Sequence, residues 1–285
     1  MEVICMKKKI LTIGIVFFLL LFGWALYENK ALQVTKYEID CSSHPELARF
    51  TIVQISDLHN EEFGEGQKKL LKMVSECDPD MIAITGDFID CRHTNVDIAM
   101  EFIEEAVDIA PVYYVPGNHE RWVSKEYKAL CQRMEDAGVR LMTDTQENFL
   151  YNNNEIVCMG IKDPDFYDAT ESDTKKILTK EVITEFEYTK EDFTLLLSHR
   201  PELFHIYTEA GIDLILTGHA HGGQFRLPFI GGLAAPNQGL FPKYDAGVFS
   251  ENDTHMVVSR GIGNSIIPLR FNNPPEIVVV KLTIK

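Results

Sequence analysis

The stretch of residues 50–60 reads FTIVQISDLHN, an apolar, β-branched run that ends in charged and polar residues. A run of this length and composition predicts a buried strand. An amphipathic stretch at residues 66–77 follows it, and a second apolar run occupies Met81–Thr85. This order predicts a sheet whose strands alternate with helices along the chain.

The alternation continues through the first half of the chain. Helices are expected at residues 95–109 and 124–137, on either side of a strand at Val112–Val115. Three strands separated by helices favour an α/β core with largely parallel strands.

The second half of the chain contains further short elements. The pattern predicts a hairpin turning at Asn152–Asn154, a helix at 172–188, strands at Phe193–Leu197 and Leu214–Thr217, a helix starting near Pro201, and a strand-rich tail from 247. Two mixed sheets packed face to face, with helices outside, would accommodate these elements. No long linker divides them, so we expect one domain.

The most informative polar residues come directly after predicted strands. They form five motifs, which read Asp57-Leu58-His59, Gly86-Asp87-Phe88-Ile89-Asp90, Gly117-Asn118-His119-Glu120, Ser198-His199 and Gly218-His219-Ala220-His221-Gly222-Gly223. In α/β sheets ligands bind at the carboxyl ends of the strands. We therefore expect these motifs to meet around one cavity.

The spacing within the motifs points to metal binding. Residues two apart in an extended chain point to the same side, so Asp57 and His59 can direct two ligand atoms into one cavity. His219 and His221 can do the same from a later strand. Imidazole and carboxylate ligands together suit zinc, iron or manganese rather than calcium. With a carboxylate that bridges two cations, the motifs predict a two-metal hydrolase.

Each motif alone has a plainer interpretation. An Asp-x-His triplet is often incidental, and Gly86–Asp90 is also typical of a turn with a structural aspartate. However, five of the nine histidines fall inside these motifs, each after an apolar run. The set as a whole therefore favours a metal site.

In this order, the five motifs resemble those of the calcineurin-like metallophosphoesterase family, over about residues 48–285. The stretches Gly218–Phe225, Ser259–Gly263 and Pro268–Phe271 are similar to a membrane-anchored bacterial branch. That branch includes enzymes that hydrolyse UDP-2,3-diacylglucosamine, a lipid A precursor. The resemblance implies a four-layer α/β/β/α sandwich of two mixed β-sheets flanked by helices.

The resemblance also implies a role for each motif residue. Two divalent transition-metal ions (manganese, zinc or iron) would be held by Asp57, His59 and His221 at the first position, Asn118, His199 and His219 at the second, and Asp87 between them. His119 would bind no metal but would contact the phosphate or protonate the leaving oxygen. The implied reaction is hydrolysis of a phosphodiester or pyrophosphate bond by a hydroxide that two metal ions activate.

Three neighbouring residues are expected to act from outside the ligand set. Asp90 is expected to be a structural partner, and Glu120 to orient its neighbours. Arg200, beside His199, is expected at the surface or in a salt bridge rather than on the phosphate.

Two other functions are compatible with the same fold. A non-catalytic metal-binding scaffold should have lost ligands or His119, and none is lost. A nuclease or nucleotide phosphodiesterase is disfavoured by a formal net charge of −16, because nucleic-acid binding normally needs a basic footprint. We therefore expect a phosphoester substrate and no nucleic acid, while the oligomeric state stays open.

The N-terminal segment places Lys7, Lys8 and Lys9 before an uncharged run from Ile10 to Tyr27. As a helix, this run covers about 27 Å, close to the hydrocarbon thickness of a bilayer. Lysines on this side predict a cytoplasmic N-terminus and a domain that faces outward. A cleaved signal peptide and a buried core helix are alternatives, although Leu26–Glu28 offers no small-residue cleavage site.

This interpretation divides the chain into residues 1–30 as a single-pass anchor in the cell membrane, 31–48 as a connector and 49–285 as an extracytoplasmic phosphoesterase domain. Anchoring favours lipid-linked or envelope substrates. A Gly- and Pro-rich stretch after the last motif contains the apolar residues Phe225, Leu227, Phe229, Ile230, Leu233, Leu240 and Phe241. They are expected to line an acyl-chain groove, to touch the membrane, or to cover a sheet edge as core.

Overall fold

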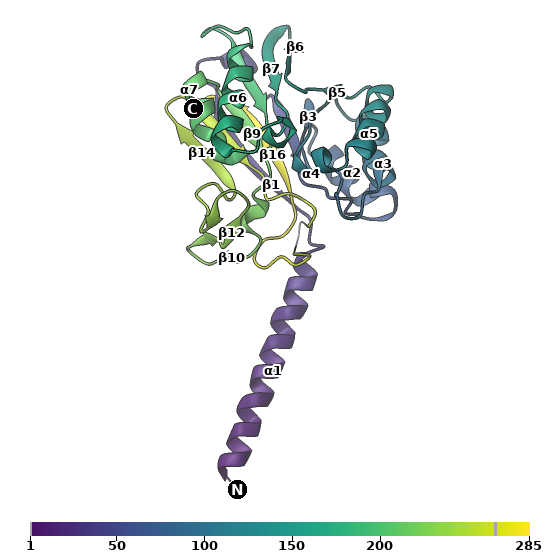
Figure 1. Cartoon of the computed structure of the whole chain (residues 1–285), viewed down its shortest axis with the longest axis vertical. Coiled ribbons are helices and arrows are strands. Elements are labelled where there is room, and N and C mark those ends of the chain that lie inside the picture. Colours follow the sequence, from purple (N-terminus) through teal and green to yellow (C-terminus); the bar gives the residue numbers. More distant parts are fainter. Residues whose placement is uncertain (1, 265–266) are drawn as a thin grey trace.

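The computed structural model describes residues 2–264 and 267–285, with the backbone alone for residues 2–5 and 8. Met1 and the side chain of Lys8, both in the predicted cytoplasmic end, lie outside the described residues. One long N-terminal helix, α1 (Glu2–Glu28), projects from a body that contains the other elements (Figure 1). Its part from Lys9 to Glu28 is long and apolar enough to cross a membrane, judged by length and composition.

The first sheet has six strands in the order β1-β16-β2-β3-β4-β5. The strands from β2 to β5 are parallel, whereas β16 runs antiparallel to β2, so the sheet is mixed. A strand that is buried on both faces has a nearly continuous apolar sequence, which explains the apolar runs of the strands at the centre of this sheet. The strands are β1 (Gln33–Asp40), β16 (Glu276–Thr283), β2 (Thr51–Ile55), β3 (Met81–Thr85), β4 (Val112–Val115) and β5 (Arg140–Leu141).

The second sheet also has six strands, in the order β14-β15-β9-β8-β7-β6. Its four inner strands are parallel and its two outer strands are antiparallel to their neighbours. The strands are β14 (Gly247–Glu251), β15 (Thr254–Val258), β9 (Leu214–Thr217), β8 (Phe193–Leu197), β7 (Asn154–Gly160) and β6 (Thr145–Tyr151).

Helices cover the outer faces of both sheets. Besides α1, the described α-helices are α2 (Lys68–Ser75), α3 (Val96–Ala106), α4 (Asn118–Trp122), α5 (Ser124–Asp136), α6 (Ser172–Thr184) and α7 (Phe204–Ala210). Short 3₁₀ turns are η1 (Pro45–Leu47), η2 (Glu65–Gln67), η3 (Pro164–Phe166), η4 (Pro201–Leu203) and η5 (His221–Gly223).

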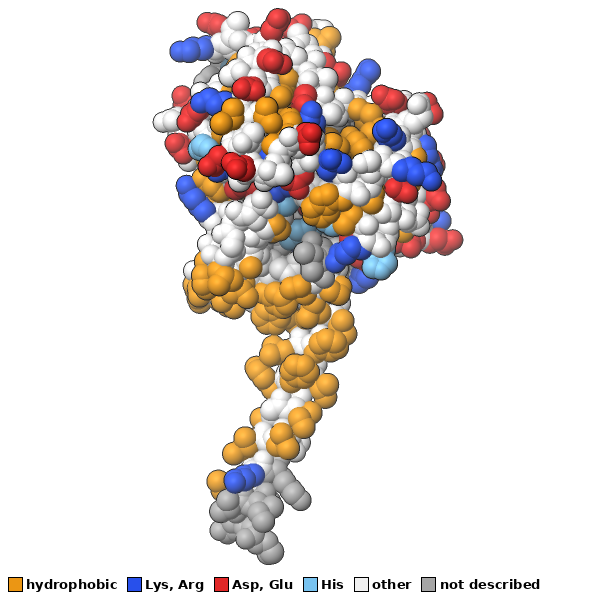
Figure 2. Space-filling model, in the orientation of Figure 1, with side chains coloured by type: hydrophobic (Ala, Val, Ile, Leu, Met, Phe, Trp, Pro, Cys, Tyr) orange, Lys and Arg blue, Asp and Glu red, His pale blue; other side chains and the backbone are white. Residues whose placement is uncertain are grey.

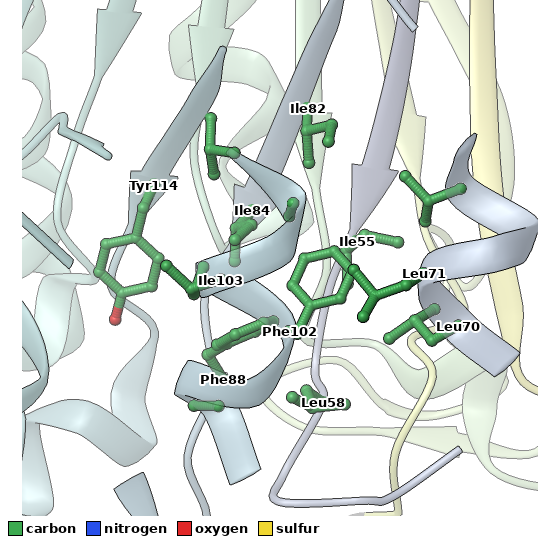
Figure 3. Close-up of a cluster of buried hydrophobic side chains, with 14 of the residues drawn as sticks. Ile55, Leu58, Leu70, Leu71, Ile82, Ile84, Phe88, Phe102, Ile103 and Tyr114 are labelled. Atoms are coloured by element: carbon green, nitrogen blue, oxygen red, sulfur yellow. The ribbon is translucent and has the colours of Figure 1, made fainter. Parts of the chain in front are cut away.

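Side chains that alternate along the central strands sort into separate cores. Ile82 and Ile84 of β3 face the helices and share a cluster with Phe102 of α3 (Figure 3). Met81 and Ala83 of the same strand point the other way, into the cluster between the two sheets. A third cluster joins the second sheet to α6 and α7. Three cores separate four layers, so the predicted α/β/β/α sandwich is confirmed.

The stretch expected to be a connector, residues 31–48, instead contains an edge strand of the first sheet. Within it, β1 pairs in parallel with β16, from Gln33 opposite Glu276 to Asp40 opposite Thr283. β1 lies at the sheet edge and most of its side chains are only half-buried. Its sequence QVTKYEID therefore contains no apolar run, although the segment is ordered structure rather than a linker.

The Gly- and Pro-rich stretch folds as two short hairpins. β10 (Arg226–Leu227) pairs with β11 (Gly231–Gly232), and β12 (Ala234–Ala235) pairs with β13 (Gly239–Leu240). Five of its large apolar side chains are exposed: Leu227, Phe229, Ile230, Leu240 and Phe241. The interpretation that they cover a sheet edge as core is therefore wrong for these five. Figure 2 shows hydrophobic surface at this end of the body.

Candidate metal centre

Loops after five strands meet at one edge of the sandwich. β2, β3 and β4 run parallel in the first sheet, as β8 and β9 do in the second, so the loops that follow lie at the carboxyl ends of the strands. These loops and the first turn of α4 carry all the predicted site residues, and all are buried: Asp57, His59, Asp87, Asn118, His119, His199, His219 and His221. Burying this many polar side chains is unfavourable unless they pair with each other or bind a metal.

One group of ligand atoms comes from Asp57, His59 and His221, which lie within 4.8 Å of one another. His59 Nε2 is 3.2 Å from His221 Nε2. The same His221 nitrogen is 3.3 Å from Asp57 Oδ1. Two nitrogens and one carboxylate oxygen therefore converge on one point from three loops.

A second group comes from Asp87, His199 and His219, within the same limit. His199 Nε2 is 3.3 Å from Asp87 Oδ2 and 3.2 Å from His219 Nδ1. Asn118 lines the same cavity, and its buried Oδ1 has no hydrogen-bond partner among the described residues. Buried polar atoms are rarely left unpaired, so this oxygen is suited to a ligand.

The distances in both groups fit metal binding. Ligand atoms bound to one metal at about 2.0–2.1 Å lie about 3.0–3.4 Å from their neighbours. The separations of 3.2 and 3.3 Å fall in this range. Asp87 Oδ2 is also 3.7 Å from His59 Nε2, so this carboxylate lies between the two groups.

Hydrogen bonding selects the nitrogen that His199 presents to the site. Its Nδ1 lies 2.7 Å from the carbonyl oxygen of Thr85, where it donates, so Nε2 faces Asp87. Burial alone would lower the pKa of His199, but the Asp87 carboxylate outweighs burial and raises this pKa to about 10. A cation bound between the two side chains would take the place of that proton.

The other imidazoles are held in the form that binds metals. Burial lowers the pKa of His219 and of His221 well below the usual value. Burial likewise lowers the pKa of His59 to about 3. Neutral imidazole has a free nitrogen lone pair, so these three side chains are available as ligands near neutral pH.

Two glycines are required because the loops approach each other closely. A Cβ added at Gly218 would lie 1.9 Å from Ser56 Oγ and 2.4 Å from Asp57 Oδ2. A Cβ at Gly117 would lie 2.3 Å from Asp87 Oδ1. Any larger residue at either position would displace a candidate ligand, which explains why both positions are glycine.

His119 lies beside both groups, and with His59 and Asp90 it forms a third set of possible ligand atoms within 4.8 Å of one another. Its Nε2 is 3.9 Å from Asp87 Oδ2, and its Nδ1 accepts a hydrogen bond from the backbone N–H of Cys91. This bond fixes the tautomer in which Nε2 carries the proton. His119 therefore presents a proton donor to the cavity.

Asp90 and Glu120 hold the loops of the site in place. Asp90 accepts from the backbone and guanidinium of Arg92 and lies 3.7 Å from His59 Nδ1. The Glu120 carboxylate accepts four backbone N–H groups, from Asp87, Phe88, Ile89 and Gly117. Glu120 thus joins the loop after β3 to the loop after β4.

Arg200 differs from the expectation of a surface side chain. It is buried and forms ion pairs with Asp163, Asp165 and Glu202, so its salt-bridge role is the one the structure contains. Its Nη1 lies 3.0 Å from His219 Nε2. Asp163 lies 37 positions earlier in the chain, and the sequence around neither residue indicates that the two side chains form an ion pair.

Two further residues at the site were not among the predicted ones. Asn237, at the tip of the β12–β13 hairpin, places its Oδ1 3.3 Å from His219 Nε2. Trp122 places its ring 5.1 Å from the ring of His119. Trp122 follows His119 by three positions on a helix, a spacing that brings side chains together and could have indicated it. No local signal pointed to Asn237, because the hairpin itself was not predicted.

The cavity above these side chains has a volume of about 250 Å³. Asp87, His119 and His221 line its floor, and Trp122 and Asn237 lie at its mouth. It is large enough for a phosphate group with part of its substituents, and Pro236 and Asn237 of the β12–β13 hairpin are part of its lining.

Comparison with known proteins identifies the family. Residues 50–223 match the calcineurin-like phosphoesterase family. The chain is 30% identical to the metallophosphoesterase YkuE of Bacillus subtilis over 92% of this chain and 89% of that protein. It is 26% identical to the phosphodiesterase YaeI of Escherichia coli, over 82% of this chain and 83% of the relative.

A third relative is UDP-2,3-diacylglucosamine pyrophosphatase LpxG of Chlamydia muridarum, with 28% identity over 81% of this chain and 82% of that protein. The match to the family, at residues 50–223, covers more than half of the chain and includes all five motifs. The chain therefore belongs to the calcineurin-like phosphoesterases, metal-dependent hydrolases that act on phosphoric ester bonds.

Proposed function

We propose that this protein is a membrane-anchored phosphoesterase that uses two divalent transition-metal ions to hydrolyse a phosphodiester or pyrophosphate bond. Its substrate is lipid-linked or part of the cell envelope. One observation carries the proposal: the buried Asp87 carboxylate lies between two groups of ligand atoms, 3.3 Å from His199 Nε2 and 3.7 Å from His59 Nε2.

Seven residues would hold the cations: Asp57, His59 and His221 the first, Asn118, His199 and His219 the second, and Asp87 both. When bound, the cations supply an activated water as nucleophile and neutralise negative charge on the phosphate. The ion identity is manganese, zinc or iron, since sites of imidazole and carboxylate accept all three.

The residues of the chain supply proton transfer and orientation. His119 Nε2–H donates to the phosphate or to the leaving oxygen, while the Cys91 N–H keeps the ring in that tautomer. Glu120 fixes the backbone on both sides of Asp87, which keeps the bridging carboxylate in place. The Arg200 guanidinium forms an ion pair with Asp163 and lies against His219, so it orients the His219 side chain rather than the phosphate.

The substrate class follows from the relatives and from α1. One relative is named as a phosphodiesterase and another as a pyrophosphatase of a diacylated nucleotide sugar, which supports a phosphodiester or pyrophosphate bond. The apolar part of α1, with lysines on its N-terminal side, supports a single-pass anchor and an extracytoplasmic domain. That orientation favours envelope substrates over cytoplasmic nucleotide sugars.

Metal-dependent hydrolysis tests this proposal. Full-length protein in detergent would be stripped with a chelator, and bis(p-nitrophenyl) phosphate hydrolysis would be measured before and after manganese, zinc or iron is added back. We expect activity to disappear on chelation and to return with at least one of these ions. Hydrolysis that survives complete metal removal, or that no ion restores, would refute it.

A further inference from the structure

An exposed hydrophobic surface lies where α1 leaves the body. We call it the hydrophobic base and define it by six exposed side chains on the two hairpins and the nearby 267–271 segment: Leu227, Phe229, Ile230, Leu240, Phe241 and Ile267. In the view of Figure 2, the base is orange and Asp and Glu side chains gather over the opposite part of the body. Large contiguous apolar patches of this kind mark interaction sites.

The end of α1 is fixed to the body rather than loosely tethered. Ala25, Glu28 and Asn29 are buried. Asn29 donates to the carbonyl oxygen of Pro268 and accepts from the backbone N–H of Arg270, at 2.9 and 2.7 Å. The Glu28 carboxylate accepts from the backbone N–H of Asn272. The helix therefore leaves the body in a defined direction.

Residues 267–273 connect the end of α1 to the hairpins and to the metal centre. The backbone N–H of Arg226 donates to Phe271, at the start of the first hairpin. Asn273 donates to the carbonyl oxygen of the candidate ligand His221, at 2.7 Å. The last turn of α1, the base and one side of the metal centre thus form one hydrogen-bonded unit.

Aromatic residues show at which level of a membrane this unit would lie. Trp24 and Tyr27 are exposed in the last turns of α1, at the end of its apolar run next to the body. Trp and Tyr are enriched at the boundary between lipid and water, so this end of α1 belongs at the level of the headgroups. The base lies beside it, at the same level.

We infer that the hydrophobic base enters the leaflet that surrounds the C-terminal end of α1, so that a phospholipid bilayer is the partner of this surface. The inference rests on the anchoring proposed above. The β12–β13 hairpin connects the base to the metal cavity, because its tip residues Pro236 and Asn237 line the cavity while Leu240 and Phe241 belong to the base. The cavity is therefore held next to the headgroup layer, where it would receive the phosphate of a membrane lipid.

Fluorescence quenching by brominated lipids tests the inference. The full-length chain would be placed in phosphatidylcholine nanodiscs with or without bromine near the start of the acyl chains, with both native tryptophans replaced (Trp24→Phe and Trp122→Phe). Phe229→Trp and Phe241→Trp probe the two hairpins separately. Leu150→Trp is the matched control, because Leu150 is 64% exposed, close to the 58% of Phe241, but lies on β6 at the far end of the body (Figure 1).

A further protein that keeps Trp24 alone reports whether α1 is in the bilayer. We expect both hairpin probes to lose about as large a fraction of their fluorescence as Trp24, and several times the fraction lost by Leu150→Trp. Interfacial anchors reach about 5–10 Å into the boundary between headgroups and acyl chains, within range of such bromines.

Other outcomes would overturn the inference in distinguishable ways. If Trp24 is quenched but both hairpin probes are quenched no more than Leu150→Trp, the body stands off the bilayer or a second copy covers the base. If all probes are quenched equally, the lipid contact is not specific to the base. If Trp24 itself is not quenched, the anchoring fails together with the inference, whereas hydrolysis of bis(p-nitrophenyl) phosphate still decides the metal chemistry.

Discussion

The metal centre and the hydrophobic base lie side by side, and they depart from the usual distribution of side chains in opposite directions. The centre buries eight polar side chains, five of which line one cavity, and this burial costs free energy unless the groups are paired. The base exposes six large apolar side chains, which forgoes the stabilisation that burial would give. Since neither arrangement favours folding, both point to partners outside the chain: cations for the centre and lipid for the base.

Changes in the centre should affect metal binding and turnover more than folding, and changes in the base should affect neither metal binding nor folding. The core between the layers, by contrast, should respond mainly in stability.

Asp87→Ala should have the largest effect. The variant removes the carboxylate between the two ligand groups, so we expect a lower metal content and hydrolysis of bis(p-nitrophenyl) phosphate at background level. Metal analysis and the ester assay on the same preparation measure both. Asp97→Ala is the control, because Asp97 is an exposed aspartate whose ion pair with Arg133 lies at the surface. Wild-type turnover by a metal-depleted Asp87→Ala variant would contradict the account.

His119→Ala should separate turnover from metal binding. We expect His119 to bind no metal, because its Nδ1 accepts from Cys91 and its Nε2 lies 3.9 Å from Asp87 Oδ2. The metal content should therefore stay at the wild-type level while the rate falls by about 10²–10⁴-fold, the usual range for a lost general acid. The loss should be smaller for p-nitrophenyl esters than for alkyl esters, because p-nitrophenolate leaves without a proton. An equal loss for both leaving groups would argue against proton donation by this residue.

Glu120→Gln should have an intermediate effect. An amide can accept at only one end, so two of the four backbone N–H groups now bound by Glu120 would lose their acceptor. We expect metal affinity to fall by about 10–100-fold and the free energy of unfolding to fall by about 1–3 kcal/mol. Metal titration and urea unfolding measure the two changes. Glu101→Gln, on the exposed face of α3, should change neither quantity. If Glu120→Gln has no larger effect than Glu101→Gln on either quantity, Glu120 does not hold the loops of the site in place.

Phe229→Ala should have the smallest effect on folding. Phe229 is fully exposed, so we expect a change of no more than about 0.5 kcal/mol in the free energy of unfolding. The matched Phe102→Ala variant, in the core shown in Figure 3, should lose about 3–5 kcal/mol. Denaturant unfolding of both full-length variants in the same detergent makes the comparison. A large loss at Phe229 would mean that the base is packed rather than exposed.

The buried parts of the fold were the most predictable from the sequence. Met81–Thr85, Phe193–Leu197 and Leu214–Thr217 were expected as strands, and β3, β8 and β9 have these bounds. Each is buried along its whole length, so its apolar run is unbroken and bounded by polar residues. The same apolar runs indicate where the candidate ligands lie in the sequence, because each motif begins where such a run ends.

Edge and surface elements were not predictable in the same way. β1 was missed because a half-buried edge strand has no apolar run, and its partner β16 lies at the other end of the chain. The hairpins at residues 226–240 were missed because strands of two residues leave no periodic pattern. The Arg200–Asp163 pair depends on how two distant loops approach, which no local pattern records.

The central claim is that one cavity holds a pair of metal ions on either side of Asp87. Full-length protein reloaded with manganese would be tested for metal content per chain and by electron paramagnetic resonance for magnetic coupling between the ions. The account predicts two manganese ions per chain with the spectrum of an exchange-coupled pair, and loss of that coupling in Asp87→Ala. A single uncoupled ion per chain in the wild-type protein, or none, would contradict it.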